Sequence, residues 1–98
     1  MTLEFHYDAG HGWLRVPIDL VKRIGSHVSP CSYRDDHFAY LEEDCDMPAF
    51  LGKYDSEPRV EPIGYASARF GRRFIEVDDG YDSFIRELAR FSQREVTQ

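Results

Sequence analysis

Hydrophobic and polar residues alternate at the start of the chain, and this pattern predicts a β-hairpin. Leu3, Phe5 and Tyr7 are separated by polar residues, which is the period of a strand with one buried face. The turn-forming sequence AGHG occupies residues 9–12, and the residues WLRV at 13–16 indicate the return strand. We therefore expect the chain to open with two antiparallel strands.

A helical pattern follows the hairpin. Ile18, Val21 and Ile24 recur at the spacing of one helix face. Pro17 suits a first turn because its missing N–H has no partner to lose there, and Gly25 suits the position just after a helix. The spacing predicts a short helix that ends at this glycine.

The middle of the chain predicts a loop, a strand and a second helix. Residues 26–36 are expected to form the loop and residues 37–43 a strand, with Phe38 and Tyr40 on one face and Ala39 and Leu41 on the other. Either Asp44 or Asp46 is expected to cap the second helix, which has Pro48 in its first turn.

The last third predicts extended segments and a C-terminal helix. Residues 59–70 are interrupted by a proline and a glycine, which favours an edge strand or loop, and residues 73–77 alternate as a strand. Five apolar residues then fall at helical spacing, namely Tyr81, Phe84, Ile85, Leu88 and Phe91. The order ββαβαββα predicts an α+β fold. We expect a single domain over residues 1–98, with a mainly antiparallel sheet of about four or five strands and about three helices on one face.

Composition supports a folded domain of this size. The 98 residues are 42% hydrophobic and 14% aromatic, which argues against disorder. No apolar run approaches the roughly 18 residues of a membrane span. The N-terminus has no basic segment followed by an apolar one, so we expect a cytoplasmic protein.

Charge is concentrated in one segment of the sequence. The twelve residues from Asp35 to Asp46 carry a formal charge of -6, equal to the net charge of the whole protein, and contain no Lys or Arg. This pattern predicts a surface that engages a basic partner and disfavours direct binding of nucleic acid, which relies on Lys and Arg. An acidic surface that serves only solubility is the alternative. The predicted partner-binding residues are Asp35, Asp36, Glu42, Glu43, Asp44 and Asp46.

Two other groups of residues contain side chains of metal-ligating types. His6, Asp8 and His11 form a trio of metal-ligating types, but a polar strand face followed by a turn is the favoured interpretation. The acidic residues 42–46 lack the glycine and the distal glutamate of an EF-hand loop. We therefore expect no metal and no other cofactor.

The two cysteines and the tryptophan each allow a functional and a structural interpretation. Cys31 and Cys45 form no CxxC pair, so free thiols are expected. A thiol nucleophile with His27 or His37 as its base is disfavoured, because the carboxylates around Cys45 raise a thiol pKa. Trp13 is expected in the core rather than at an exposed interface.

Two blocks resemble a known family. The sequences HGWLRVP (residues 11–17) and SYRDDHFAYLEEDCD (residues 32–46) are similar to an uncharacterised family of small proteobacterial domains, often encoded on plasmids and other mobile elements. The resemblance covers about the first half of the chain. It implies a genetic context and brings no activity or catalytic residue with it.

Together these features predict a non-enzymatic acidic protein-binding domain. The expected partner is a basic protein surface, such as the nucleic-acid channel of a host defence complex, and the expected role is an inhibitor of the anti-CRISPR or anti-restriction type. One alternative is a small metal-dependent or thiol enzyme that uses His6, Asp8 and His11, or Cys45. Another is a homodimeric accessory domain, with Trp13 and the C-terminal helix at the interface.

Overall fold

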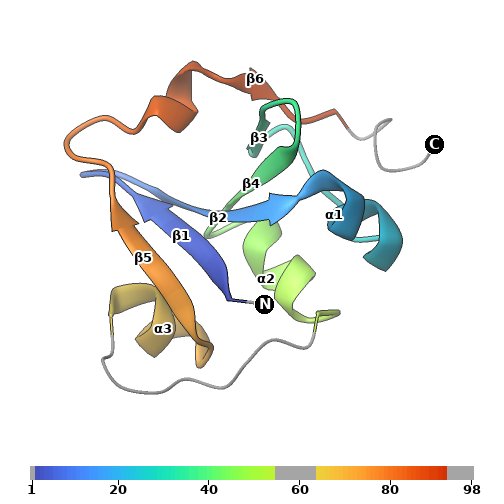
Figure 1. Cartoon of the computed structure of the whole chain (residues 1–98), viewed down its shortest axis with the longest axis horizontal. Coiled ribbons are helices and arrows are strands. Elements are labelled where there is room, and N and C mark those ends of the chain that lie inside the picture. The colour runs from blue at the N-terminus through green and yellow to red at the C-terminus, as the bar shows by residue number, and fades with distance from the viewer. Residues whose placement is uncertain (1, 55–63, 93–98) are drawn as a thin grey trace.

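A six-stranded sheet in the order β5-β1-β2-β4-β3-β6 forms the centre of the protein (Figure 1). It is seen in a computed structural model that describes residues 2–54 and 64–92. The strands are β1 (Leu3–Tyr7), β2 (Gly12–Pro17), β3 (Tyr33–Arg34), β4 (Phe38–Glu42), β5 (Phe74–Asp78) and β6 (Ala89–Arg90). The helical elements are α1 (Ile18–Ile24), α2 (Asp46–Leu51), α3 (Tyr65–Phe70) and the 3-10 turn η1 (Phe84–Glu87).

The predicted α+β class is confirmed. Strand β5 pairs with β1 in parallel, and the remaining neighbours pair antiparallel, so the sheet is mainly antiparallel as expected. The sheet has more strands than predicted because β3 and β6, of two residues each, extend it beyond β4.

The N-terminal hairpin forms as the alternating pattern predicts. Phe5 of β1 lies opposite Leu14 of β2, and both side chains are fully buried. Strand β2 begins at Gly12. The residue at this position has to be glycine because a Cβ atom would overlap the Phe5 ring. The close approach lets the ring lie over the end of the hairpin.

Helix α1 begins one residue later than expected. Pro17 is the last residue of β2 and occupies the N-cap, so the helix proper begins at Ile18. Gly25 ends the helix with φ of 72°, and its N–H donates to the carbonyls of Val21 and Lys22. A left-handed conformation at this position is natural for glycine and satisfies the last carbonyls.

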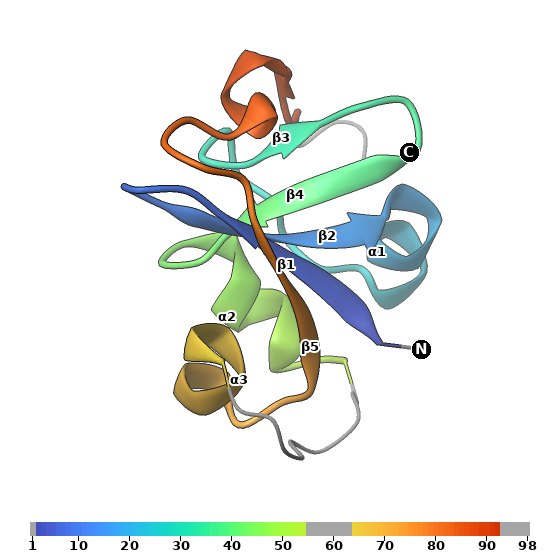
Figure 2. The same cartoon turned by 60° about the vertical axis from the view of Figure 1, so that its left-hand side comes forward.

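Two clusters of buried side chains lie on opposite faces of the sheet. All three helices pack against the face formed by Leu3, Phe5, Leu14 and Val16. The segment that contains η1 and β6 crosses the other face (Figure 2). Trp13, Tyr40 and Ile85 are buried together on this face. Neighbouring residues of β4 divide between the clusters, as predicted, with Ala39 and Leu41 in the first and Phe38 and Tyr40 in the second.

The predicted C-terminal helix is wrong. Only the short turn η1 forms, Leu88 is extended with ψ of 165°, and β6 pairs with β3. The apolar residues do not share one buried stripe, since Ile85 enters the cluster around Trp13 whereas Phe91 enters the core below the helices. An extended chain reaches both clusters, and the free edge of β3 gives it backbone partners.

Three further expectations need correction. The predicted loop over residues 26–36 contains β3. The segment over residues 59–70, predicted to be an edge strand or loop, contains helix α3, whereas residues 59–63 lie outside the described part of the chain. The tail after Arg94, which is expected from the sequence to fray, also lies outside it. Neither Asp44 nor Asp46 caps α2, since Cys45 occupies the N-cap and Asp46 is turned into the protein.

Candidate functional site

The acidic segment does not form one continuous surface. Asp35 and Asp36 precede β4, whereas Glu42, Glu43 and Asp44 lie at or after its end. A strand of five residues separates the two groups by roughly 16 Å at about 3.3 Å per residue. The predicted binding residues therefore divide between opposite ends of the sheet.

Asp35 is engaged in the β3–β4 corner. Its carboxylate accepts hydrogen bonds from the N–H groups of His37 and Phe38 and from the Tyr40 hydroxyl at 2.7 Å. Burial opposes its ionisation, but these bonds outweigh it, so the pKa of Asp35 lies below its usual value. Burial and the same carboxylate raise the pKa of Tyr40 to about 12. Asp36, in contrast, is exposed.

Glu43 and Asp44 are held by Arg69 of helix α3. The buried Glu43 carboxylate accepts from Arg69 Nη1 at 2.6 Å and from the Tyr65 hydroxyl at 2.8 Å, and the exposed Asp44 accepts from Arg69 Nη2 at 2.8 Å. The hydrogen bond to Asp44 raises the pKa of Arg69, and the bond to Glu43 raises that of Tyr65. These contacts connect α3 to the end of β4.

Asp46 has a structural role in the interior. It accepts hydrogen bonds from the backbone N–H and hydroxyl of Ser29, at 3.1 and 2.9 Å, and from the hydroxyl of Ser32. Its side chain is buried, so it is not available to a protein partner. The bonds fasten the loop before β3 to the start of α2.

Strand directions bring a second set of carboxylates to the end where β4 finishes. Strands β1 and β5 are parallel, and β4 runs in the same direction as β1 because each is antiparallel to β2. The carboxyl ends of all three strands therefore lie at one end of the sheet (Figure 2). We call this region the acidic end, and its exposed members are Asp44, Asp78, Tyr81 and Asp82.

The loop of residues 78–84 at the acidic end is tightly anchored. The Asp79 N–H donates to the Tyr7 carbonyl at 2.8 Å, and the Ala9 N–H donates to the Tyr81 carbonyl at 3.3 Å. Although its backbone is fixed, Tyr81 is 82% exposed and Phe84 is 49% exposed. Large aromatic side chains are thus presented to solvent on an ordered loop.

Asp8 provides the strongest anchor of this region. Its two oxygens accept from Nε and Nη2 of Arg86 at 2.6 and 2.9 Å, and from the backbone N–H groups of Ser83, Gly10 and His11. The bond to Arg86 holds the pKa of Asp8 far below its usual value, against the opposing effect of burial.

The histidines singled out from the sequence do not converge on a metal site. His6 lies between two carboxylates, with Nε2 2.9 Å from Glu4 and Nδ1 3.0 Å from Asp79. His11 is exposed, and its Nδ1 lies 3.7 Å from Glu42. Within residues 2–54 and 64–92, no group of three or more His, Cys, Asp or Glu side chains is arranged to hold a metal ion.

The cysteines are free thiols on the surface, as predicted. The Ser29 hydroxyl, 3.4 Å from Cys45 Sγ, favours the thiolate, but the Cys31 thiol, burial and Asp46 outweigh it and raise the pKa of Cys45. No hydrogen bond joins either cysteine to a histidine in the part of the chain that the structure describes. The geometry thus gives no support to a thiol nucleophile with a histidine base.

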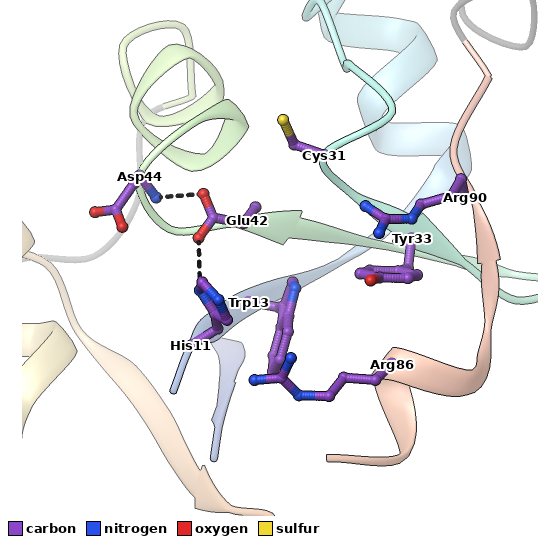
Figure 3. Close-up of a pocket in the computed structure, with 8 residues that line it drawn as sticks. All are labelled: His11, Trp13, Cys31, Tyr33, Glu42, Asp44, Arg86 and Arg90. Atoms are coloured by element: carbon purple, nitrogen blue, oxygen red, sulfur yellow. Dashed lines mark hydrogen bonds and ion pairs between the residues drawn. The ribbon is translucent and has the colours of Figure 1, made fainter. Parts of the chain in front are cut away.

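A pocket of about 370 Å³ lies beside the acidic end, and Figure 3 shows its lining. Trp13 forms part of the wall and is 2% exposed, so the prediction that it lies in the core is confirmed. The features expected at a homodimer interface are absent from the described residues, because the tryptophan is buried and the C-terminal helix does not form. Homodimer formation itself stays a prediction. The residues that line the pocket are His11, Trp13, Cys31, Tyr33, Glu42, Asp44, Arg86 and Arg90.

Sequence reasoning missed most of the residues at this end of the protein. Tyr81, Arg86 and Arg90 lay within the supposed helix, where the spacing of Tyr81 indicated packing rather than a place on a surface loop. The sequence DDGYD at residues 78–82 carried a signal, since acidic residues around a glycine favour a turn and leave the tyrosine exposed.

Comparisons with protein-family models, curated proteins and solved structures found no match. The resemblance of the two sequence blocks to a mobile-element family therefore stays a prediction. No helix within the described residues is long and apolar enough to cross a membrane.

Proposed function

We propose that the protein is a non-enzymatic binding domain whose acidic end engages a basic surface of another protein. Tyr81 would lie at the centre of the contact, with Asp78, Asp82 and Asp44 around it. Tyrosine is enriched among the residues that dominate protein–protein affinity, and carboxylates around it would steer a basic partner.

The presentation of Tyr81 is the observation that supports this proposal. Its side chain is 82% exposed, yet the loop that bears it is fastened to the β1–β2 turn through Asp8 and through backbone hydrogen bonds. Binding would therefore lose little conformational entropy, since the loop is ordered beforehand.

The proposal assigns partner binding to only some of the acidic residues predicted from the sequence. Asp36 and Asp44 are exposed and can meet a partner, although Asp36 lies at the opposite end of β4. Asp35, Glu43 and Asp46 hold parts of the fold together instead. The contribution of acidic charge to binding thus falls mainly to the carboxylates around Tyr81.

A Lys/Arg-rich channel that binds nucleic acid is the kind of basic surface that we propose as the target. The net charge of -6 and the resemblance to mobile-element domains support an inhibitor of a host defence system, of the anti-CRISPR or anti-restriction type. Charge complementarity would make association fast and sensitive to salt.

The experiment is affinity capture from host lysate at low and high salt, with mass spectrometry of the retained proteins. The variant Asp78→Lys/Asp82→Lys reverses the charge at the acidic end. The control is Asp19→Lys, which reverses one charge where the acidic-end variant reverses two. This exposed carboxylate follows β2 and so lies at the other end of the sheet. Circular dichroism verifies that both variants fold.

We expect wild type and the Asp19→Lys control to retain a basic protein that high salt releases, and the acidic-end variant to lose it. The target is then purified, and its affinity for Tyr81→Ser should fall about 30-fold or more, as for a central interface tyrosine. Equal retention by wild type and the acidic-end variant would contradict the proposal, as would the capture of no basic protein.

A further inference from the structure

We propose that the pocket in Figure 3 binds a small zwitterion of the α-amino acid type. The inference is independent of the proposed protein contact, because it rests on groups inside the pocket rather than on the exposed loop. The pocket holds hydrogen-bond donors and a carboxylate side by side, since Trp13 and Glu42 are cross-strand partners in β2 and β4.

The first observation is an unsatisfied donor. Trp13 is 2% exposed, and its indole Nε1 is buried without a hydrogen-bond partner within the described part of the chain. A buried indole N–H normally has a partner. Figure 3 shows the nitrogen edge of Trp13 facing the space between Glu42, Cys31 and Tyr33. An oxygen atom of a ligand in this space would complete the hydrogen bonding of the indole.

A cation borders the same space. The guanidinium of Arg90 lies 4.4 Å above the Tyr33 ring and donates through Nη1 to the Pro30 carbonyl at 2.9 Å. These contacts fix its plane but use only one of the five N–H donors that an arginine has. Together, Arg90 and the Trp13 N–H offer a carboxylate both a charge and hydrogen bonds.

Glu42 provides the opposite charge beside Trp13. One of its oxygens accepts from the Asp44 N–H at 2.9 Å, which holds the carboxylate in place. The other, Oε2, is buried without a hydrogen-bond partner among the described residues, and His11 Nδ1 lies 3.7 Å away. An ammonium group of a ligand would supply the donor that this oxygen lacks.

The aromatic rings do not offer a stacking site for a flat ligand. Arg86 lies 5.4 Å from the centre of the Trp13 ring, and Arg90 covers Tyr33. The pocket therefore presents hydrogen-bonding edges rather than open ring faces. Its volume of about 370 Å³ suits a small molecule. A free amino acid carries a carboxylate and an ammonium on the same carbon atom. It can therefore offer the carboxylate to the Trp13 N–H and the ammonium to Glu42, the cross-strand neighbour of Trp13.

Trp13 makes the test direct because it is the only tryptophan in the chain. The ¹H–¹⁵N cross-peak of its indole N–H and its fluorescence are followed while each proteinogenic amino acid is added at millimolar concentration. The best ligand is then compared with its N-acetyl derivative, which lacks the ammonium, and its methyl ester, which lacks the carboxylate.

We expect at least one free amino acid to shift the indole cross-peak saturably, and both derivatives to bind about tenfold more weakly or worse. If the N-acetyl derivative binds as tightly as the free amino acid, the pocket is an anion site and the proposal fails. If no amino acid shifts the cross-peak, the proposal fails as well.

A variant separates the charge of Glu42 from its structural role. Glu42→Gln keeps an oxygen for the Asp44 N–H but removes the charge that would attract an ammonium, so we expect affinity to fall about tenfold or more. Asp36→Asn, at the far end of β4, is the matched control and should bind like wild type. Equal affinity of Glu42→Gln and wild type would overturn the assignment of the ammonium position.

Discussion

Asp8 shows how much of this protein depends on one carboxylate. Its side chain is buried and joins the β1–β2 turn to Arg86 and to the backbone of Ser83. A buried ion pair adds modest net stability, but removal of one partner is costly because the other charge stays without compensation. The loop that presents Tyr81 therefore depends on this residue.

We predict that Asp8→Asn lowers the free energy of unfolding at neutral pH by about 2–3 kcal/mol, reduced from the range for fully buried pairs because Arg86 is one-third exposed. The pKa of Asp8 is lowered in the folded state, so its contribution is complete above the ordinary carboxyl pKa near 4 and is lost as the pH falls below it. Urea denaturation at several values between about pH 7 and pH 2 measures the difference in the free energy of unfolding between wild type and Asp8→Asn. This difference should stay constant from about pH 7 down to about pH 4 and shrink below that. A difference that stayed constant in the acidic range as well would contradict this account.

At the scale of single residues, the sequence predicted which residues carry charge better than it predicted where their side chains lie. The concentration of charge from Asp35 to Asp46 was evident, but alternation along β4 could not show that Asp46 turns inward to two serines. Nor could it show that Arg69 would hold Glu43, because the two residues are 26 apart in the chain. Such pairings depend on how the elements pack.

The start of helix α3 depends on a side chain from strand β5. The N–H groups of Ala66 and Ser67 donate to the two carboxylate oxygens of Glu76 in β5, each at 3.1 Å. The residue before them is Gly64, and glycine is needed there because a Cβ atom would overlap the same carboxylate. This capping from a distance explains why residues 64–70 gave no helical start signal of their own.

We predict that Glu76→Gln destabilises the protein by about 1 kcal/mol, because the amide has one acceptor oxygen where the carboxylate has two and carries no charge at the helix start. Hydrogen exchange at Ala66 and Ser67 should accelerate relative to wild type. Asp82→Asn, an exposed carboxylate, serves as the control and should change neither quantity. Unaltered exchange in Glu76→Gln would show that the cap is not needed.

At the scale of elements, the reliable predictions were those with a local cause. The hairpin and α1 formed because alternation, Pro17 and Gly25 specify them within a few residues. The C-terminal helix failed because Ile85 and Phe91 belong to clusters on opposite faces of the sheet, which a regular helix cannot reach together. Apolar residues at helical spacing indicate that their side chains will be buried, but they do not indicate which surface each side chain will contact.

The whole molecule has two buried clusters that share the same central strands. In β2, Trp13 belongs to one cluster and Leu14 to the other, and Tyr40 and Leu41 divide β4 in the same way. Neither cluster can lose its packing without disturbing the strands that support the other. Cooperative unfolding follows from this arrangement.

We predict that tryptophan fluorescence, which reports the cluster around Trp13, and far-UV circular dichroism give the same urea midpoint. A fluorescence transition at clearly lower urea would show that the segment containing η1 and β6 detaches first. Repeating the comparison on Asp8→Asn tests whether the ion pair to Arg86 is needed for this coupling.

The parallel pairing of β5 with β1 has a consequence for synthesis of the chain. Leu3 pairs with Phe74, and Asp8 binds Arg86, 78 residues further along. Strands β1, β2 and β4 are made first, and β1 must keep its outer edge unpaired until β5 emerges. An open edge beside apolar residues readily pairs with another chain. The nascent polypeptide, rather than the finished protein, is therefore the form most exposed to aggregation.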